Sequence, residues 1–394
     1  MSGYEQESQA TNVGQNGAIR ASRWTSDDVA AIAAMPVPQA ALISADQAAP
    51  MVAGLALWDL WPVQTDEGAL AQVAGGTLWV ILSAKRHDDP NARHDMARMR
   101  LFHQCGETWR DCGLLLPDGF APGSREWSGS TRLDPATGCV TLWFTAAGRR
   151  EGGPPFEQRL FQASGQIDLT GDLPRISGWT GLCECVGNQR AFYADTAIVQ
   201  GAPGRIKGFR DPFWFRDPQT GTGYLLFTAS LPGQVSDHDG VIGIAQADGS
   251  IFAALPPLVD ATGVSNELEL PHVLYRDGQY YLFWNTQASV FVPGGPAGPT
   301  GLYGMVAPSL FGPYEPLNRS GLVLANPVAE PRQAYGWRVL PSLEVISFVD
   351  YWGLKGRDTD ASPALRATQF GGTVAPMSRI EIIGKTTRIV ATGP

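Results

Sequence analysis

The 394-residue chain lacks the long apolar runs and the basic clusters that mark several common protein classes. No stretch approaches the roughly 18 apolar residues that a membrane-spanning helix needs. The polar start, "MSGYEQESQATNVGQNGAIR", contains no recognisable secretory signal. The net charge of -9 comes without basic clusters, so neither nucleic acid nor a membrane surface is an expected partner. These absences favour a neutral or cationic ligand.

Cysteine and histidine are also scarce, which argues against a metal centre. The five cysteines are odd in number and form no pair of C-x-x-C motifs. Cys183 and Cys185 in "CEC" are interpreted as two residues on one face of a strand, with a ligand or redox role as the lesser alternative. His87 and His94 in "RHDDPNARH" are expected to lie in a solvated loop. No metal site is predicted.

Helical periodicity is confined to one short segment near the start of the chain. Residues 1–22 are predicted to be disordered or extended, and "TSDDVAAIAAM" predicts a short helix with Thr25 or Ser26 as its N-cap. Short β-branched and aromatic runs separated by turn residues then fill most of the remaining chain. The pair Asp277 and Gly278 predicts a hairpin. Evenly spaced strands without intervening helices favour a propeller or a large barrel. The sequence contains no internal repeat from which the number of blades could be counted.

Several acidic residues lie inside apolar, strand-like runs, where an isolated carboxylate is costly. Asp59 lies between two tryptophans in "LWDLWPVQ", and Asp211 lies among aromatics in "FRDPFWF". Asp217, in "RDPQTG", is explained by a hairpin turn. Glu267 and Glu269 alternate with leucines in "SNELELPHV", which puts both carboxylates on one strand face. Their mutual repulsion should raise the pKa of one of them and make a proton donor available.

Six stretches, in the same order along the chain, resemble glycoside hydrolase family 68, the levansucrases, inulosucrases and bacterial β-fructofuranosidases, especially the branch from Gram-negative bacteria. They are "LWDLWPVQ", "EWSGST", "FRDPF", the Glu-x-Glu stretch before "PHV", "LFGPYEPLN" and "FGGTVAPMSRIEI". The resemblance covers residues from about 50 to 385. It implies an all-β fold, a five-bladed β-propeller with an axial funnel as active site. A single catalytic domain over residues 23–394, including the short N-terminal helical segment, is therefore expected.

The resemblance also implies a retaining mechanism with three acidic residues. Such enzymes use one carboxylate as nucleophile and a second, about 5 Å away, as acid/base. By motif match, Asp59 is the nucleophile that attacks the anomeric carbon of fructose, and Glu269 protonates the bridging oxygen so that glucose leaves. Asp211 would bind ring hydroxyls and stabilise the positive charge that develops on the sugar.

A set of substrate-binding residues is implied around these acids. Trp58 and Trp127 would form the walls of the fructose site, and Ser128 would hydrogen-bond the nucleophile. Arg210 would keep the neighbouring aspartate charged and reach substrate hydroxyls. Glu267 would contact the glucosyl side of the substrate.

Two positions depart from the family pattern on the side of the leaving group and the acceptor. Leu270 stands directly after the acid/base glutamate, where the family commonly has arginine. Gln287 in "WNTQAS" stands near a position where the family usually has arginine or histidine. Losing a cation that could bind sugar hydroxyls should reshape this subsite. The hypothesis is that fructose recognition is intact while acceptor handling is atypical.

Three functions therefore remain open at this point. The first is a levansucrase-type fructosyltransferase that uses sucrose as donor and passes the fructosyl group to sucrose, a growing fructan or water. The second is a β-fructofuranosidase, in which water takes the fructosyl group. The third is a carbohydrate-binding propeller without catalysis.

No cofactor is expected. Family members from Gram-positive bacteria carry a calcium site, but no aspartate-rich loop here maps to it. The family usually works outside the cytoplasm, so an extracellular or periplasmic location is expected although the chain shows no signal peptide. The oligomeric state is not predicted.

Overall fold

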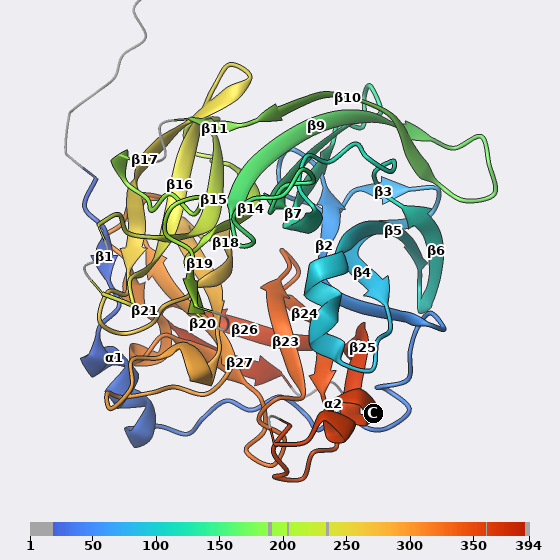
Figure 1. Cartoon of the computed structure of the whole chain (residues 1–394). Coiled ribbons are helices and arrows are strands. Elements are labelled where there is room, and N and C mark those ends of the chain that lie inside the picture. Colours follow the sequence, from blue (N-terminus) through green and yellow to red (C-terminus); the bar gives the residue numbers. More distant parts are fainter. Residues whose placement is uncertain (1–18, 188–190, 203–204, 234–235, 360, 391–394) are drawn as a thin grey trace, which may run out of the picture.

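β-Strands make up nearly all of the regular structure (Figure 1). The computed structural model describes residues 19–187, 191–202, 205–233, 236–359 and 361–390. Within these ranges there are two short α-helices, α1 (Ser26–Ala30) and α2 (Pro363–Gln369). The 3-10 turns are η1 (Ala31–Ala34), η2 (Pro90–Met96), η4 (Ala288–Val290) and η5 (Leu317–Arg319). The prediction of a mostly β protein is confirmed.

The strands form four large sheets and one small one. The nine-stranded sheet contains β2 (Leu55–Gln64), β3 (Gln72–Val73), β4 (Gly76–Lys85), β5 (Arg98–Cys105), β6 (Thr108–Leu114), β7 (Arg125–Leu133), β8 (Cys139–Ala147), β9 (Gln158–Asp168) and β10 (Arg175–Glu184). The six-stranded sheet contains β1 (Ser22–Arg23), β11 (Val186–Gly187), β14 (Phe209–Arg216), β15 (Gly223–Ser230), β16 (Gly240–Asp248) and β17 (Ile251–Asp260).

Two five-stranded sheets complete the large ones. The first contains β18 (Glu269–Arg276), β19 (Gln279–Thr286), β20 (Gly301–Ala307), β21 (Glu315–Pro316) and β22 (Leu322–Ala325). The second contains β23 (Ala334–Val339), β24 (Glu344–Tyr351), β25 (Phe370–Val374), β26 (Ser378–Ile383) and β27 (Thr386–Val390). The small sheet pairs β12 (Gly201–Ala202) with β13 (Arg205–Ile206).

Tight turns join consecutive strands into antiparallel hairpins, as the turn residues predict. Asp277 and Gly278 connect β18 to β19 with φ angles of 50° and 78°, the positive values that a type I′ hairpin requires. At the end of β14, the Asp217 carbonyl accepts a hydrogen bond from the Gly221 N–H at 2.7 Å. Both hairpin predictions are confirmed.

Five strands form a closed ring of contacts at the centre of the molecule. β2 contacts β7, β7 contacts β14, β14 contacts β18, β18 contacts β23, and β23 contacts β2. Figure 1 shows the sheets following one another around this centre in sequence order, from blue through green and yellow to red. Neighbouring sheets bury their apolar faces against each other, and the fully buried side chains there include Trp61, Trp79, Phe144 and Trp284. The ring brings the first and last sheets together.

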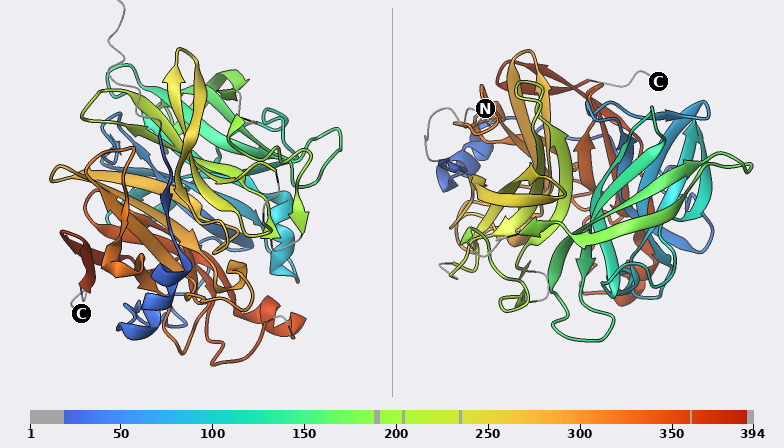
Figure 2. Two further views of the ribbon diagram at one scale, coloured as in Figure 1. Left: turned by 90° about the vertical axis from the view of Figure 1, so that its left-hand side faces the viewer. Right: turned by 90° about the horizontal axis from the view of Figure 1, so that it is seen from above.

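The predicted N-terminal helix is confirmed as α1. Thr25 is its N-cap and forms a capping box with Asp28, which satisfies free N–H groups of the first turn. The prediction for residues 1–22 lies mostly outside the described residues, and Ser22 belongs to β1, which pairs in parallel with β17. The left view in Figure 2 shows this blue segment running along the neighbouring sheets.

Trp24 anchors the same segment. Its side chain is fully buried, its Nε1 donates to the Ser320 carbonyl at 3.0 Å, and its ring packs edge-on against Trp284 at 5.3 Å. Further along, Gln39 forms a β-bridge with Ala325. The chain start is therefore packed against sheets formed by residues more than 200 positions later.

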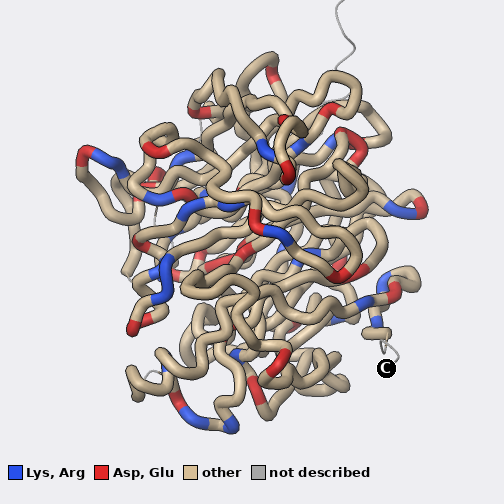
Figure 3. The backbone as a smooth tube through the Cα atoms, turned by 90° about the vertical axis from the view of Figure 1, so that its right-hand side faces the viewer, with Lys and Arg blue, Asp and Glu red and all other residues tan. Residues whose placement is uncertain are grey.

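Charged residues of both signs are interspersed on the side of the molecule shown in Figure 3. No helix of the described residues is long and apolar enough to cross a membrane.

Candidate active site

Each of the five ring strands is interrupted by a register shift, and the predicted acids lie at these shifts. The shifts lie between Trp58 and Leu60, Trp127 and Gly129, Arg210 and Phe213, Glu269 and His272, and Tyr335 and Arg338. A bulge of this kind redirects a side chain out of the regular alternation of the strand. The sequence pattern does not reveal these bulges, because the alternation of residue types continues through them.

Three of the bulges hold a non-glycine residue in the left-handed region. The φ angles are 33° for Asp59, 61° for Asp211 and 51° for Leu270, and Gly336 has a φ of 67°. Such a conformation costs of order 1–3 kcal/mol and persists only where the surroundings enforce it. Strain of this kind gathers at functional sites, and here it gathers around the predicted nucleophile and stabiliser.

Asp59 is held from two sides. The Ser128 hydroxyl donates to its Oδ2 at 2.8 Å, as predicted. Gly336 approaches it so closely that a Cβ there would lie 3.0 Å from Oδ1. Burial, and then the charge of Asp211, raise the pKa of Asp59 to about 7, while the Ser128 hydrogen bond opposes the rise. The side chain stays partly exposed, so a ligand can reach it.

Asp211 is more deeply buried than Asp59. Its Oδ2 accepts hydrogen bonds from the Thr228 hydroxyl at 2.9 Å and from the Leu270 N–H at 3.3 Å. The Arg210 Nε lies 3.6 Å from the same oxygen. Burial raises the pKa of Asp211 to about 6, and Arg210 limits the rise. Its carboxylate is therefore mostly ionised at neutral pH.

Glu267 and Glu269 lie side by side, but around a guanidinium and not along one strand. Glu269 begins β18, whereas Glu267 precedes it. Arg210 Nη2 lies 2.7 Å from Glu269 Oε1 and 3.4 Å from Glu267 Oε2. Burial, and then the charge of Glu269, raise the pKa of Glu267 to about 8. The raised pKa that the sequence predicts for the pair thus falls on Glu267.

Tyr335 is a neighbour of the acids that the sequence analysis missed. Its hydroxyl donates to Glu269 Oε2. Burial, and then the charge of Glu269, raise the pKa of Tyr335 above its usual range, so the hydroxyl remains a donor. The sequence gives no sign of this role, because an uncharged tyrosine in the aromatic stretch "AYGWRV" looks like an ordinary strand residue.

Thr145 is a second missed residue, and it connects two of the bulged strands. Its hydroxyl accepts from the Asp211 N–H at 2.9 Å and donates to the Ser128 carbonyl at 3.1 Å. One fully buried side chain therefore fixes the backbone beside the predicted stabiliser and beside the partner of the predicted nucleophile.

The predicted tryptophans are braced by η2, in the segment where the sequence analysis expected a solvated loop. His87 and His94 are both exposed, as expected, but residues 90–96 form a 3-10 turn in which Arg93 is buried. The Trp127 Nε1 donates to the His94 carbonyl at 3.3 Å, and the exposed His94 ring meets Trp58 edge-on at 5.9 Å. Arg93 lies over the Trp58 ring at 5.6 Å. Cation–π contacts explain why the arginine turns inward at this point.

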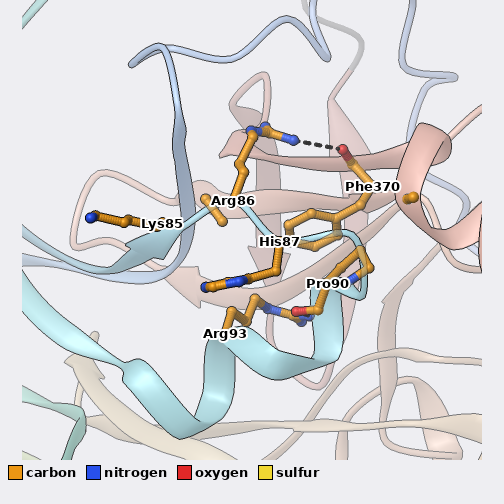
Figure 4. A pocket seen from close by; sticks show the side chains of 8 residues that line it. Lys85, Arg86, His87, Pro90, Arg93 and Phe370 are labelled. Atoms are coloured by element: carbon orange, nitrogen blue, oxygen red, sulfur yellow. Dashed lines mark hydrogen bonds between the residues drawn. The ribbon is translucent and has the colours of Figure 1, made fainter.

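Arg93 also borders a small cavity together with Lys85 and Arg86 (Figure 4). Its guanidinium packs on Phe370 at 4.5 Å, and Arg86 donates to the Phe370 carbonyl at 3.2 Å. The cavity volume of about 60 Å³ has room for a few water molecules. None of the predicted acids or tryptophans lines it.

The two positions that depart from the family pattern differ in their surroundings. Leu270 is 5% exposed, and its backbone N–H is the donor to Asp211. Gln287 is half-buried at the end of β19, and its carbonyl accepts from the Val290 N–H at 3.2 Å. Among the described residues, no hydrogen bond links the Gln287 side chain to the acids.

Known proteins resemble this chain over most of its length. The family model described as levansucrase/invertase, glycoside hydrolase family 68, matches residues 14–240 and 234–392. A levansucrase, LscA, from Pseudomonas savastanoi pv. glycinea is 32% identical over 372 residues, covering 83% of this chain and 84% of that protein. A levansucrase from Zymomonas mobilis is 33% identical over 358 residues, covering 83% of this chain and 80% of that protein. These matches are consistent with the expected Gram-negative branch.

A solved structure gives the same result. The inulosucrase from Halalkalicoccus jeotgali bound to kestose superimposes with a TM-score of 0.84 at 36% identity, covering 94% of this chain and 95% of that one. The family resemblance seen in the sequence motifs is thereby confirmed. The chain belongs to the levansucrase/invertase family, glycoside hydrolase family 68.

Proposed function

We propose that the chain is a retaining fructosyltransferase of the levansucrase type that acts on sucrose. The observation that carries the proposal is the convergence of Asp59, Asp211 and Glu269 with Arg210 at the bulges of ring strands. The names of the relatives, levansucrases and an inulosucrase bound to kestose, support the same substrate class.

The proposed architecture is a five-bladed β-propeller with an axial funnel, forming one domain over residues 23–394. The nine-stranded sheet would then consist of two four-stranded blades, one of β2, β4, β5 and β6 with the short β3 paired to β4, and one of β7 to β10, joined by the short parallel pairing of β2 with β7. The closed ring of five strands supports this assignment. The acids would lie where the ring strands open toward solvent.

In the first step, the Asp59 carboxylate attacks the anomeric carbon of the fructosyl unit while Glu269 gives a proton to the departing glucosyl oxygen. The proton can come from the glutamate pair, because Glu267 holds one up to a pKa of about 8. Arg210, between the two carboxyls, holds them in place while the proton passes to the leaving group.

Asp211 would stabilise the positive charge that develops on the sugar ring. This role requires an ionised carboxylate, and Arg210, Thr228 and the Leu270 N–H all favour ionisation. Trp58 and Trp127 would form the walls of the fructose site, and the Ser128 hydroxyl would fix the orientation of the Asp59 carboxylate.

In the second step, Glu269 takes a proton from the group that attacks the fructosyl–Asp59 ester. A sugar hydroxyl gives transfer, and water gives hydrolysis. Leu270 and Gln287 stand where the family carries cations, so we expect the ratio of the two outcomes to depend on them. The acceptors would be sucrose, fructo-oligosaccharides or fructan, encountered in an extracellular or periplasmic location.

The test is incubation of the purified chain with sucrose over a range of concentrations, with free glucose, free fructose and product size measured separately. Glucose in excess of fructose supports transfer, and product size separates polymer from oligosaccharides. Equal amounts at every concentration indicate a β-fructofuranosidase. Release of neither sugar contradicts the proposal. D59N is the control, because any activity that survives it does not use Asp59.

A further inference from the structure

A second cavity lies at the opposite ends of the same ring strands. Asp59, Asp211 and Glu269 occupy the first halves of β2, β14 and β18. The last residues of these strands and of β23 surround a cavity of about 390 Å³. Its walls include Pro62, Phe213, Val273, Tyr275, Arg338 and Leu340. This cavity and the acid cluster therefore lie at different levels along the ring strands.

Arg338 is a buried cation on the wall of this cavity. Its side chain is 5% exposed, and its guanidinium carbon lies 5.2 Å from the centre of the Phe213 ring. Among the described residues, no hydrogen bond or ion pair to the guanidinium of Arg338 is found. Burial lowers the pKa of Arg338 to about 10, although the charges of Asp211 and Asp59 oppose the fall. These two acids act on Arg338 without an ion pair to it, so its buried guanidinium has no counter-charge at contact distance, which is costly.

The other charged residues around the cavity are already engaged or lie at its rim. The Asp217 carboxylate accepts hydrogen bonds from the Tyr280 hydroxyl at 2.5 Å and from the Thr220 hydroxyl at 2.8 Å. Glu67 is exposed. Arg276, at the rim, pairs with the neighbouring Asp277 at 3.3 Å, and the exposed Arg216 pairs with Asp66. The guanidinium of Arg338 is thus the charge directed to an incoming anion.

We propose that this cavity binds a small carboxylate that carries an apolar, aromatic group. The carboxylate would pair with the guanidinium of Arg338, whose planar fork fits two carboxylate oxygens. The aromatic group would pack on the apolar walls around Phe213, Val273 and Leu340. These apolar walls favour an aromatic ring over a neutral, hydroxyl-rich sugar. The site therefore differs in position and in chemistry from the one proposed for sucrose.

The test is isothermal titration calorimetry of the full chain with benzoate at neutral pH. Benzyl alcohol and acetate serve as matched probes. Benzyl alcohol keeps the ring without the charge, and acetate keeps the charge without the ring. We expect one benzoate per chain, with at least tenfold weaker binding of either matched probe. Saturating fructose should leave benzoate affinity within twofold, because the two ligands occupy different sites.

Variants of the arginines around the cavity test whether benzoate binds beside Arg338. R338M removes the charge at similar length and should weaken benzoate binding at least tenfold, whereas R276Q, at the rim, should change it less than twofold. R338K keeps the charge without the planar fork, should weaken binding several-fold, and provides the test if R338M does not fold. Equal affinity in the wild type and the Arg338 variants, competition by fructose, or absence of benzoate binding would each overturn the proposal.

Discussion

Asp211 and Asp217 belong to two copies of the same Arg-Asp-Pro triplet, one at the start and one at the end of β14. Both carboxylates are almost fully buried, at 5% and 4% exposure. Asp211 lies at a bulge with a φ of 61° and takes its donors from β15 and β18. Asp217 caps its own hairpin turn, accepting from the Gln219 N–H at 3.0 Å.

The difference shows that tertiary surroundings, and not the triplet, decide what each carboxylate does. Asp217 is satisfied by its own turn and by one tyrosine hydroxyl, so its hydrogen bonds stabilise the hairpin. Asp211 is held by other strands, and burial first, then the nearby charge of Glu269, raise its pKa. A carboxylate in this second situation is available for chemistry but costs stability.

The largest expected effect is on catalysis in D211N. Loss of the charge that we propose stabilises the transition state should lower kcat for sucrose roughly 10³-fold, while the fold persists. D217N is the matched control, and its folded fraction should keep kcat within a few-fold of the wild type. Steady-state kinetics of both variants, with circular dichroism to confirm that they are folded, measure this difference. Equal losses in kcat would show that the two carboxylates do not differ in their importance for catalysis.

The second effect is on stability in D217N. An asparagine cannot accept all the hydrogen bonds of the buried carboxylate, so the free energy of unfolding should fall by about 2 kcal/mol. Urea unfolding of D217N and D211N measures this. A D217N variant as stable as the wild type would show that the turn does not depend on the carboxylate.

The third effect concerns pH. The pKa values of Asp59 and Asp211, about 7 and about 6, lie above the ordinary 3.8. The folded state therefore keeps protons that the unfolded state has released, and stability that is present below pH 4 is lost as the pH rises through 7. D59N should lessen this fall in Tm and gain of order 2 kcal/mol over the wild type at neutral pH. Parallel Tm profiles of the two proteins would contradict the raised pKa.

A fourth, smaller effect follows from S128A. Removing the hydroxyl that donates to Asp59 should lower kcat/KM about tenfold. The same hydrogen bond opposes the rise of the Asp59 pKa, so the acidic limb of the pH–rate profile should move to higher pH. S130A, on the same strand, is the matched control, because it removes a hydroxyl that accepts from the Trp214 N–H at 2.8 Å and does not bond to Asp59. A limb that does not move in S128A would assign that limb to another group.

The smallest effect tests the bulge that faces Asp59. In G336A the new Cβ would lie 3.0 Å from Asp59 Oδ1, at a φ of 67°. We expect a loss of about 1 kcal/mol in stability and a several-fold loss in kcat. G356A provides the control, since its φ of 76° is similar and nothing lies within 4 Å of its added Cβ. If kcat falls equally in both variants, contact with Asp59 is not the cause.

Much of this molecule could be predicted from local sequence patterns. Thr25 or Ser26 as N-cap predicted the helix start, and Asp277 with Gly278 predicted a hairpin, because each depends on residues only a few positions apart. The acids of interest were found because a charged residue in an apolar run demands an explanation. Arg338 in "YGWRVLP" meets the same criterion and could have been found in the same way.

What the sequence could not predict depends on contacts between distant strands. The bulges at Asp59 and Leu270, the Tyr335 hydroxyl on Glu269, and the link through Thr145 all join residues brought together by the ring. Neutral side chains in regular strand patterns give no local sign of these contacts. The inward turn of Arg93 was missed for the same reason, since Trp58 and Phe370 draw it from what reads as a polar loop.

The ring closes between its first strand and one of its last, and this has a consequence for synthesis on the ribosome. Asp59 emerges early, but Gly336, which completes its surroundings, emerges near the end of translation. Trp24 likewise emerges long before Ser320, the residue whose carbonyl accepts its hydrogen bond. All the predicted acids are therefore present in the unfinished chain before the ring of strands can close around them. The moment during translation at which sucrose turnover begins would show when the ring closes.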